Sequence, residues 1–142
     1  MKVMVIVKAT RTSEAGVLPT EAEFKAMGDF NRQLVEAGIM VTGDGLLPSS
    51  RGKRIHFSEG RVTVVDGPFP DPESLVAGFW IWKVKSMDEA VEWARRCPDP
   101  MPGEDSVLEL RAMPEPEDFG ESFTPELRAE EERLRTELEK GR

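Results

Sequence analysis

Residues 76–97 read VAGFWIWKVKSMDEAVEWARRC, and this stretch decides the fold because a strand passes into a helix there. Aromatic and β-branched residues fill positions 76–84, which predicts a strand. Ser86, followed three residues later by Glu89, is the pattern of a capping box, so the helix begins directly after the strand. Residues 106–113 then predict a last strand, which completes one β-α-β unit.

The N-terminal half predicts a second unit of the same kind. Residues 2–9 are apolar on both faces, which is typical of a central strand. Residues 10–19 predict a loop. A capping box at Thr20 opens a helix that ends at Gly38, and residues 39–47 predict another strand, interrupted by two glycines.

A β-hairpin is predicted between the two units. Residues 53–58 and 61–65 alternate between polar and apolar side chains around a tight turn. Pairing of Ser58 with Arg61 sets the register. One face of the hairpin is then apolar, and we expect it to be half buried: Ile55, Phe57, Val62 and Val64.

This order of elements predicts a ferredoxin-like α+β sheet with both helices on one face. We expect Trp80 or Trp82 to point to the other face. Met4 and Ile6 are expected on that face too. Because a bare apolar face of that size does not stay in water, we expect a homodimer in which a second copy of the chain covers it.

The composition changes at residue 114, where an acidic linker begins. We therefore place one domain at residues 1–118 and a charged C-terminal extension at residues 119–142. Thr124 and Pro125 predict the start of a helix in this extension. We expect the helix to lie on a surface, across a partner subunit, or to fray, because its apolar stripe is narrow: Leu127, Leu134 and Leu138.

The chain has 142 residues, of which 39% are hydrophobic and 32% charged, as is typical of one folded domain. Its net charge of −8 disfavours direct binding to nucleic acid. No apolar run is long enough to span a membrane, and the single cysteine, Cys97, excludes an internal disulfide, so we expect a cytoplasmic protein. Cys97 ends a helix, where a thiolate is not stabilised, and we expect it to be inert.

No sequence motif indicates a cofactor or a metal. A glycine-rich phosphate loop, a zinc-ligand spacing and a serine nucleophile motif are all missing from the sequence. The expected ligand is instead a small anion, because basic residues gather in an otherwise acidic chain: Arg51, Lys53, Arg54 and Arg61. The alternative is that these residues are the solvated edge of the hairpin.

The stretch Asp66-Gly67-Pro68-Phe69 directly follows the hairpin and is rich in proline on its C-terminal side. Prolines at 68, 70 and 72 fix three φ angles, so this segment predicts a rigid turn in which Gly67 tolerates a positive φ. Asp66 has two interpretations. It is a general base or an anchor for a substrate hydroxyl, or it is a turn carboxylate bonded to backbone amides.

Five further residues are candidates for a site. His56, the only histidine, is a second acid–base group or a surface residue. Asp44, between two glycines, is a second carboxylate for a ligand or marks a bulge. Arg54 and Arg51 bind an anionic substrate in this interpretation. Trp80 forms the wall of a pocket or belongs to the core or a dimer interface.

Taken together, these features resemble the YCII-related family, in the branch named for its DGPF motif, over residues 1–118. The resemblance rests on six stretches: 30–38, GDGLLP at 43–48, DGPF at 66–69, GFWI at 78–81, 86–98 and 109–111. It implies a ferredoxin-like fold assembled as a dimeric α+β barrel. Relatives are suspected enzymes with a His and an Asp near a cleft. Only Asp66 matches that pair by position, because the first predicted helix holds no histidine.

Two functional hypotheses follow. The first is a small-molecule-binding homodimer with isomerase- or lyase-like acid–base chemistry at Asp66. The alternative is a non-catalytic binding or regulatory module that uses the charged C-terminal helix as its contact element. For that alternative, the resemblance implies sigma-factor signalling, because DGPF members are associated genomically with extracytoplasmic-function sigma factors. The sequence does not decide whether the protein is an enzyme, and it identifies no substrate.

Overall fold

The computed structural model describes residues 1–141, which fall into two compact units. The first unit is Met1–Ala112, and the second begins at Met113, earlier than the boundary predicted at 118. The elements of the first unit are β1 (Lys2–Lys8), α1 (Arg11–Glu14), α2 (Glu21–Glu36), β2 (Met40–Gly45), η1 (Ser49–Arg51), β3 (Lys53–Ser58), β4 (Arg61–Asp66), η2 (Pro72–Ser74), β5 (Val76–Lys83), α3 (Met87–Arg95) and β6 (Leu108–Ala112).

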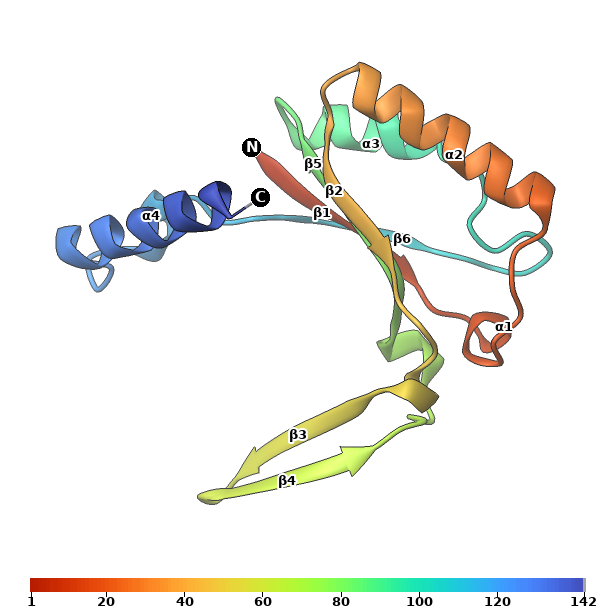
Figure 1. Cartoon of the computed structure of the whole chain (residues 1–142), viewed down its shortest axis with the longest axis horizontal. Coiled ribbons are helices and arrows are strands. Elements are labelled where there is room, and N and C mark those ends of the chain that lie inside the picture. The colour runs from red at the N-terminus through yellow and green to blue at the C-terminus, as the bar shows by residue number, and fades with distance from the viewer. Residues whose placement is uncertain (142) are drawn as a thin grey trace. The chain divides into compact units, whose positions relative to one another are not determined.

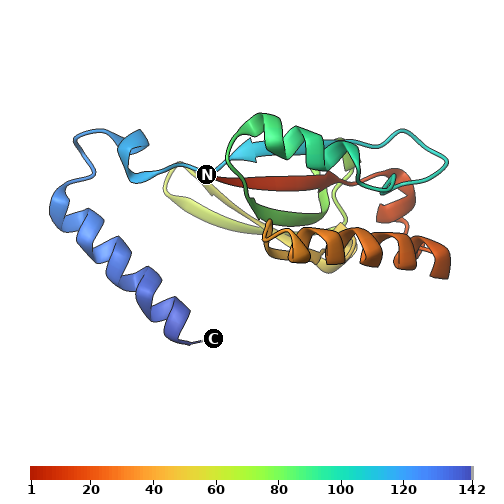
Figure 2. The same cartoon turned by 90° about the horizontal axis from the view of Figure 1, so that it is seen from above.

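The main sheet of the first unit has four strands in the order β2-β5-β1-β6, and every neighbouring pair is antiparallel. The two helix-connected pairs, β1 with β2 and β5 with β6, are therefore each parallel without being neighbours. This is the β-α-β-β-α-β arrangement, with the β3–β4 hairpin inserted as a separate two-stranded sheet. The prediction of a mixed α+β fold with a hairpin is confirmed. Figure 1 and Figure 2 show α2 and α3 together on one face of the sheet.

The core lies between that face and the two helices. Val3 and Val5 of β1 are fully buried, and so is Leu34 of α2. Trp80 and Trp82 of β5 pack beside them, with ring centroids 5.7 Å apart. Phe30 completes the cluster through edge-on contacts with both indoles, a geometry that aromatic rings favour.

The prediction that Trp80 or Trp82 points away from the helices is wrong. Residues two apart on a strand share a face, so the two indoles must lie together. They are 6% and 0% exposed under the helices. Trp80 Nε1 donates a hydrogen bond to Asn31 Oδ1 of α2 at 2.8 Å, which explains how its polar atom is accommodated in the core.

The other face of the sheet carries two rows of side chains, set by the strand register. Met4 pairs with Ile81, and Ile6 pairs with Phe79. All four side chains are half buried. On the β2 edge these rows end in Thr42 and Asp44, and on the β6 edge in Arg111 and Glu109. This face therefore has an apolar centre with polar residues along both edges. It is the face opposite the one that α2 and α3 cover.

Two local predictions need correction. The segment 10–19 is not simply a loop, because Thr10 and Ser13 form a reciprocal capping box that starts the short helix α1. The hairpin register is confirmed, with Ser58 opposite Arg61. Its apolar face is not half buried in this chain, since Phe57 is 78% exposed and Val62 is 64% exposed.

The second unit holds η3 (Pro116–Phe119) and the helix α4 (Pro125–Lys140). Thr124 caps α4 by accepting from the backbone N–H of Leu127, and Pro125 occupies its first turn, as predicted. All three leucines of its narrow stripe are exposed: Leu127, Leu134 and Leu138. Among residues 1–141, none of the helices combines the length and the apolar character that a membrane crossing requires.

Candidate functional site

The DGPF turn is anchored at the base of the β3–β4 hairpin by a close backbone approach. The N–H of Gly67 donates to the carbonyl of Gly52 at 3.0 Å. A Cβ on Gly67 would lie only 1.7 Å from the carbonyl oxygen of Ser49. Gly67 does not have a positive φ, so the turn does not use the tolerance of positive φ that glycine offers. Glycine is needed here because another backbone occupies the space of a side chain.

Ser49 and Glu14 complete this anchor from two other segments. The N–H of Phe69 donates to Ser49 Oγ at 3.0 Å. The Glu14 carboxylate in turn accepts from the Ser49 N–H at 2.9 Å and also from the Ser49 hydroxyl. One group of hydrogen bonds therefore joins three segments of the chain: α1, η1 and the DGPF turn. Sequence reasoning missed Glu14 and Ser49 because neither belongs to a motif and both lie in stretches without periodicity.

The structure places Asp66 and His56 apart. Asp66 sits opposite Lys53 in the hairpin and forms an ion pair with it, and its side chain is 74% exposed. His56 sits opposite Thr63. Side chains alternate between the two faces of a strand, so His56 and Asp66 project from opposite faces of the hairpin. Within one chain they do not form an acid–base pair.

The remaining candidates are distributed over four places. Arg54 is half buried, with its guanidinium 3.9 Å from the centre of the Phe69 ring, a cation–π contact. Arg51 is exposed in η1. Trp80 belongs to the core, so it does not line an open surface of this chain. Asp44 lies at the β2 end of the open-face row that contains Phe79.

The glycines beside Asp44 have packing roles. A Cβ on Gly43 would lie 2.7 Å from Trp80 Cδ1, so glycine leaves room for the indole. The register shift in β2 lies between Met40 and Thr42, before these glycines. Asp44 Oδ1 accepts from the N–H of Gly45 at 2.9 Å. The expected bulge is present in the strand, but it is displaced from Asp44 itself.

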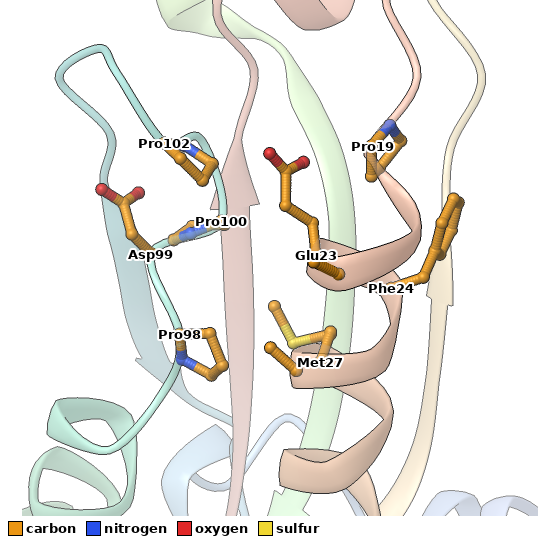
Figure 3. A pocket seen from close by; sticks show the side chains of 10 residues that line it. Pro19, Glu23, Phe24, Met27, Pro98, Asp99, Pro100 and Pro102 are labelled. Carbon is orange, nitrogen blue, oxygen red and sulfur yellow. The ribbon is translucent and has the colours of Figure 1, made fainter.

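A groove that sequence reasoning did not predict lies between the start of α2 and the proline-rich segment after α3 (Figure 3). Its volume is about 370 Å³, and its lining is mostly apolar, with Met27, Phe24 and three prolines of the segment. Its two carboxylates are already engaged. Glu23 accepts from the N–H of Thr20, and Asp99 accepts from the N–H of Met101 and from the Ser106 hydroxyl. The groove therefore offers shape but little free polar chemistry.

Cys97 lies close to this segment and is chemically quiet. Burial raises the pKa of its thiol to about 11, and the negative charge of Asp99 contributes in the same direction. The thiol also donates to the carbonyl of Pro98 at 3.2 Å. A thiol in such surroundings is not a nucleophile near neutral pH. In the part of the chain that the structure describes, no three carboxylate, imidazole or thiol groups gather as metal ligands.

Comparison with known proteins identifies a family, a related sequence and a similar solved structure. The model of the YCII-related domain matches residues 1–113. An uncharacterised protein of Rhizobium meliloti (strain 1021) is 32% identical over 78 residues, which cover 53% of this chain and 63% of the relative. The matched part thus spans less than two thirds of that relative.

A solved structure also matches, at 17% identity and a TM-score of 0.41, over 77% of this chain and 91% of the other. It is a 5-chloro-2-hydroxyhydroquinone dehydrochlorinase from Burkholderia phenoliruptrix AC1100 in complex with 2,5-dihydroxybenzoquinone. At that level of similarity, the match says nothing about the chemistry of this chain.

The anchor at Gly67 predicts a large effect of a single methyl group. Gly67→Ala should lower the free energy of unfolding by about 3 kcal/mol or more, because the backbone of Ser49 must move to admit a Cβ. Urea unfolding followed by tryptophan fluorescence measures this. Gly28→Ala is the matched control, since a Cβ there meets nothing within 4 Å in helix α2, and it should be neutral or stabilising by about 0.5–1 kcal/mol. Equal effects of the two substitutions would contradict the role of Gly67.

The raised pKa of Cys97 predicts slow alkylation. At pH 9 a thiol of ordinary pKa is half ionised, whereas one with a pKa of about 11 is ionised to roughly 1%. Iodoacetamide should therefore label the native protein roughly fifty times more slowly than a cysteine peptide, with the rate still rising above pH 10. Mass spectrometry of the intact chain measures the rate, and urea should restore the peptide value. Rapid labelling of the native protein at pH 8 would contradict the assignment.

Proposed function

This chain belongs to the YCII-related domain family, and from that premise we propose that it is a small-molecule-binding homodimer of the DGPF branch. The observation that carries the proposal is the face of the main sheet that α2 and α3 leave open. Met4, Ile6, Phe79 and Ile81 form its apolar centre. In this proposal a second copy packs its own open face against it, which gives a dimeric α+β barrel.

The physical reason for the dimer is the cost of leaving this centre in water. Burial of apolar area contributes about 25 cal/mol per Å². A sheet face flanked by helices on its other side packs well against a second sheet, and the same patch then serves both copies of a two-fold dimer. The polar residues on both edges fit this arrangement, because they form the rim around an apolar interface.

The ligand class follows from the same rows. A compact, flat molecule lies on Phe79 and Ile6, with a hydroxyl or an anionic group at the edge of the sheet. Asp44, at the β2 end of the row of Phe79 and Ile6, accepts a hydroxyl in this proposal. Arg111 ends the neighbouring row of Met4 and Ile81, lies 3.4 Å from Glu109, and contacts an anionic group. Small aromatic acids and phenols meet these requirements. The dimer encloses them between the two sheets.

The proposal assigns binding, not acid–base catalysis, to this site. Asp66 is an exposed partner of Lys53 and lies on the face opposite His56, so it lacks the enclosed surroundings and the paired histidine that the predicted acid–base chemistry requires. Arg54 lies over the ring of Phe69, where its guanidinium supports the DGPF turn. The sequence predicted that Arg54 contacts an anion. In this proposal Arg111 makes that contact instead.

The dimer is tested by placing a charge in the centre of the open face. Ile6→Lys should weaken self-association at least about tenfold, because a lysine must lose its hydration in the interface. Val91→Lys, on the exposed side of α3, is the control and should leave the dissociation constant within about threefold of the original. Sedimentation equilibrium of the full chain measures both. Wild-type protein that stays monomeric at tens of micromolar would refute the proposal.

Ligand binding is tested on the wild-type dimer with a panel of small aromatic acids and phenols. A ligand present at 100 times its dissociation constant adds about 2.7 kcal/mol of stability, which raises the melting temperature by several degrees. Asp44→Asn should reduce the shift produced by a phenol, whereas Asp66→Asn should leave it unchanged. A shift that depends on Asp66 and not on Asp44 would move the site to the hairpin base and contradict the proposal.

A second candidate function rests on α4. Its exposed leucines, Leu127, Leu134 and Leu138, are separated by seven and four residues, which places them on one side of the helix. A stripe of this kind suits contact with another protein in a regulatory module. Deletion of residues 120–142 should then abolish capture of that partner while the melting shift with small aromatic acids persists. If the deletion removes the melting shift as well, the helix belongs to the ligand site and the regulatory function fails.

A further inference from the structure

The β3–β4 hairpin carries an apolar patch that is exposed in this chain. Ile55 is 48% exposed, Phe57 78%, Val62 64% and Val64 58%. Ile55 pairs with Val64 and Phe57 with Val62, so the four side chains form one continuous patch across both strands. A two-stranded hairpin by itself is marginally stable in water. The patch therefore needs a cover that the rest of the first unit, Met1–Ala112, does not supply.

The opposite face of the hairpin has a different character. It carries Arg54, His56 and Ser58 from β3, and Arg61 and Thr63 from β4. Polar and apolar side chains thus alternate along both strands, as is typical of a strand pair that is packed on one face and solvated on the other. Only the apolar face is suited to burial. A partner has to approach from the side of Phe57 and Val62.

The charge distribution of the chain favours one of the possible partners that could cover this patch. The chain has a net charge of −8, yet four basic residues lie in and beside the hairpin: Arg51, Lys53, Arg54 and Arg61. A strongly acidic chain is repelled by anionic lipid and by nucleic acid. Two whole copies carry like charge, but residues 51–66 carry +2 (four basic residues against Glu59 and Asp66) and the rest of the chain −10, so the hairpin of one copy is attracted to the remainder of the other.

The place of the hairpin in the fold fits a second copy as well. Figure 1 shows β3 and β4 extending from the end of the main sheet, away from the layer of α2 and α3. Strands of six residues reach about 20 Å. A copy seated on the open face of the sheet lies on this same side.

We infer that the apolar face of the β3–β4 hairpin packs against the second copy of the dimer. Because the two copies are related by a two-fold axis, each hairpin makes the same contact with the other copy. The inference rests on the proposed homodimer and adds a second element to its interface. The side chains that bury area are Phe57 and Val62 near the tip, with Ile55 and Val64 behind them. Arg54 and Arg61 lie on the other face of the hairpin, so their attraction to the acidic second copy acts at longer range than the apolar contact.

The test compares the same chemical change on the two faces of one strand. Phe57→Ser and Val62→Ser in the full chain should each raise the dimer dissociation constant at least about tenfold in sedimentation equilibrium. Val65→Ser, on the opposite face, should change it by less than about threefold. Thermal melts followed by circular dichroism establish that each variant is folded.

A second measurement on the wild type does not depend on any variant. Amide hydrogen exchange in residues 53–66 should slow when the protein concentration is raised from below to above the dissociation constant. A wild-type dimer with unchanged exchange there, and with unaltered affinity in both variants, would refute the hairpin contact but leave the sheet-to-sheet dimer intact. A wild type that is monomeric throughout would refute both. Monomeric protein that binds phosphatidylserine vesicles through Phe57 would assign the patch to a membrane instead and refute the inference.

Discussion

The antiparallel pairing of β1 with β5 is the constraint on which the molecule depends. Its register places Val3 and Val5 on the same face as Trp80 and Trp82, and that choice fixes the face to which the helices pack. Because side chains alternate along each strand, every residue between them is committed to the other face. The apolar rows of the open face are therefore a direct consequence of how the core is filled.

The DGPF motif illustrates how a sequence motif can serve structure. Gly67 leaves room for the carbonyl of Ser49, and the ring of Phe69 receives Arg54. Asp66 pairs with Lys53 at the surface, a contact of a kind that contributes about 0–1 kcal/mol. The glycine and the aromatic ring thus have clear structural roles, whereas the carboxylate has a weak one. The motif fastens a hairpin to the end of the sheet.

Local patterns were sufficient for most of the fold. The capping box at Thr20, the N-cap at Ser86 and the pairing of Ser58 with Arg61 depend on neighbours along the chain, and each is readable from the sequence. The full capping box predicted at Ser86 is not formed, because the Glu89 carboxylate accepts from the N–H of Lys85 instead. The contact between Glu14 and Ser49 joins residues that are 35 positions apart, and no local pattern indicates it. The groove beside α2 forms in the same way, from two segments whose approach depends on the whole sheet.

Strand parity decides which of the candidate side chains can meet, and residue type alone does not show it. His56 and Asp66 are the residue types that acid–base chemistry uses, yet an odd or even position decides whether two such side chains meet. In a hairpin with Ser58 opposite Arg61, the partner of His56 is Thr63, and Asp66 is directed to the other face. The same parity that separates these two residues gathers Ile55, Phe57, Val62 and Val64 into one apolar patch. The separation of His56 from Asp66 and the exposed apolar patch are thus two results of a single register.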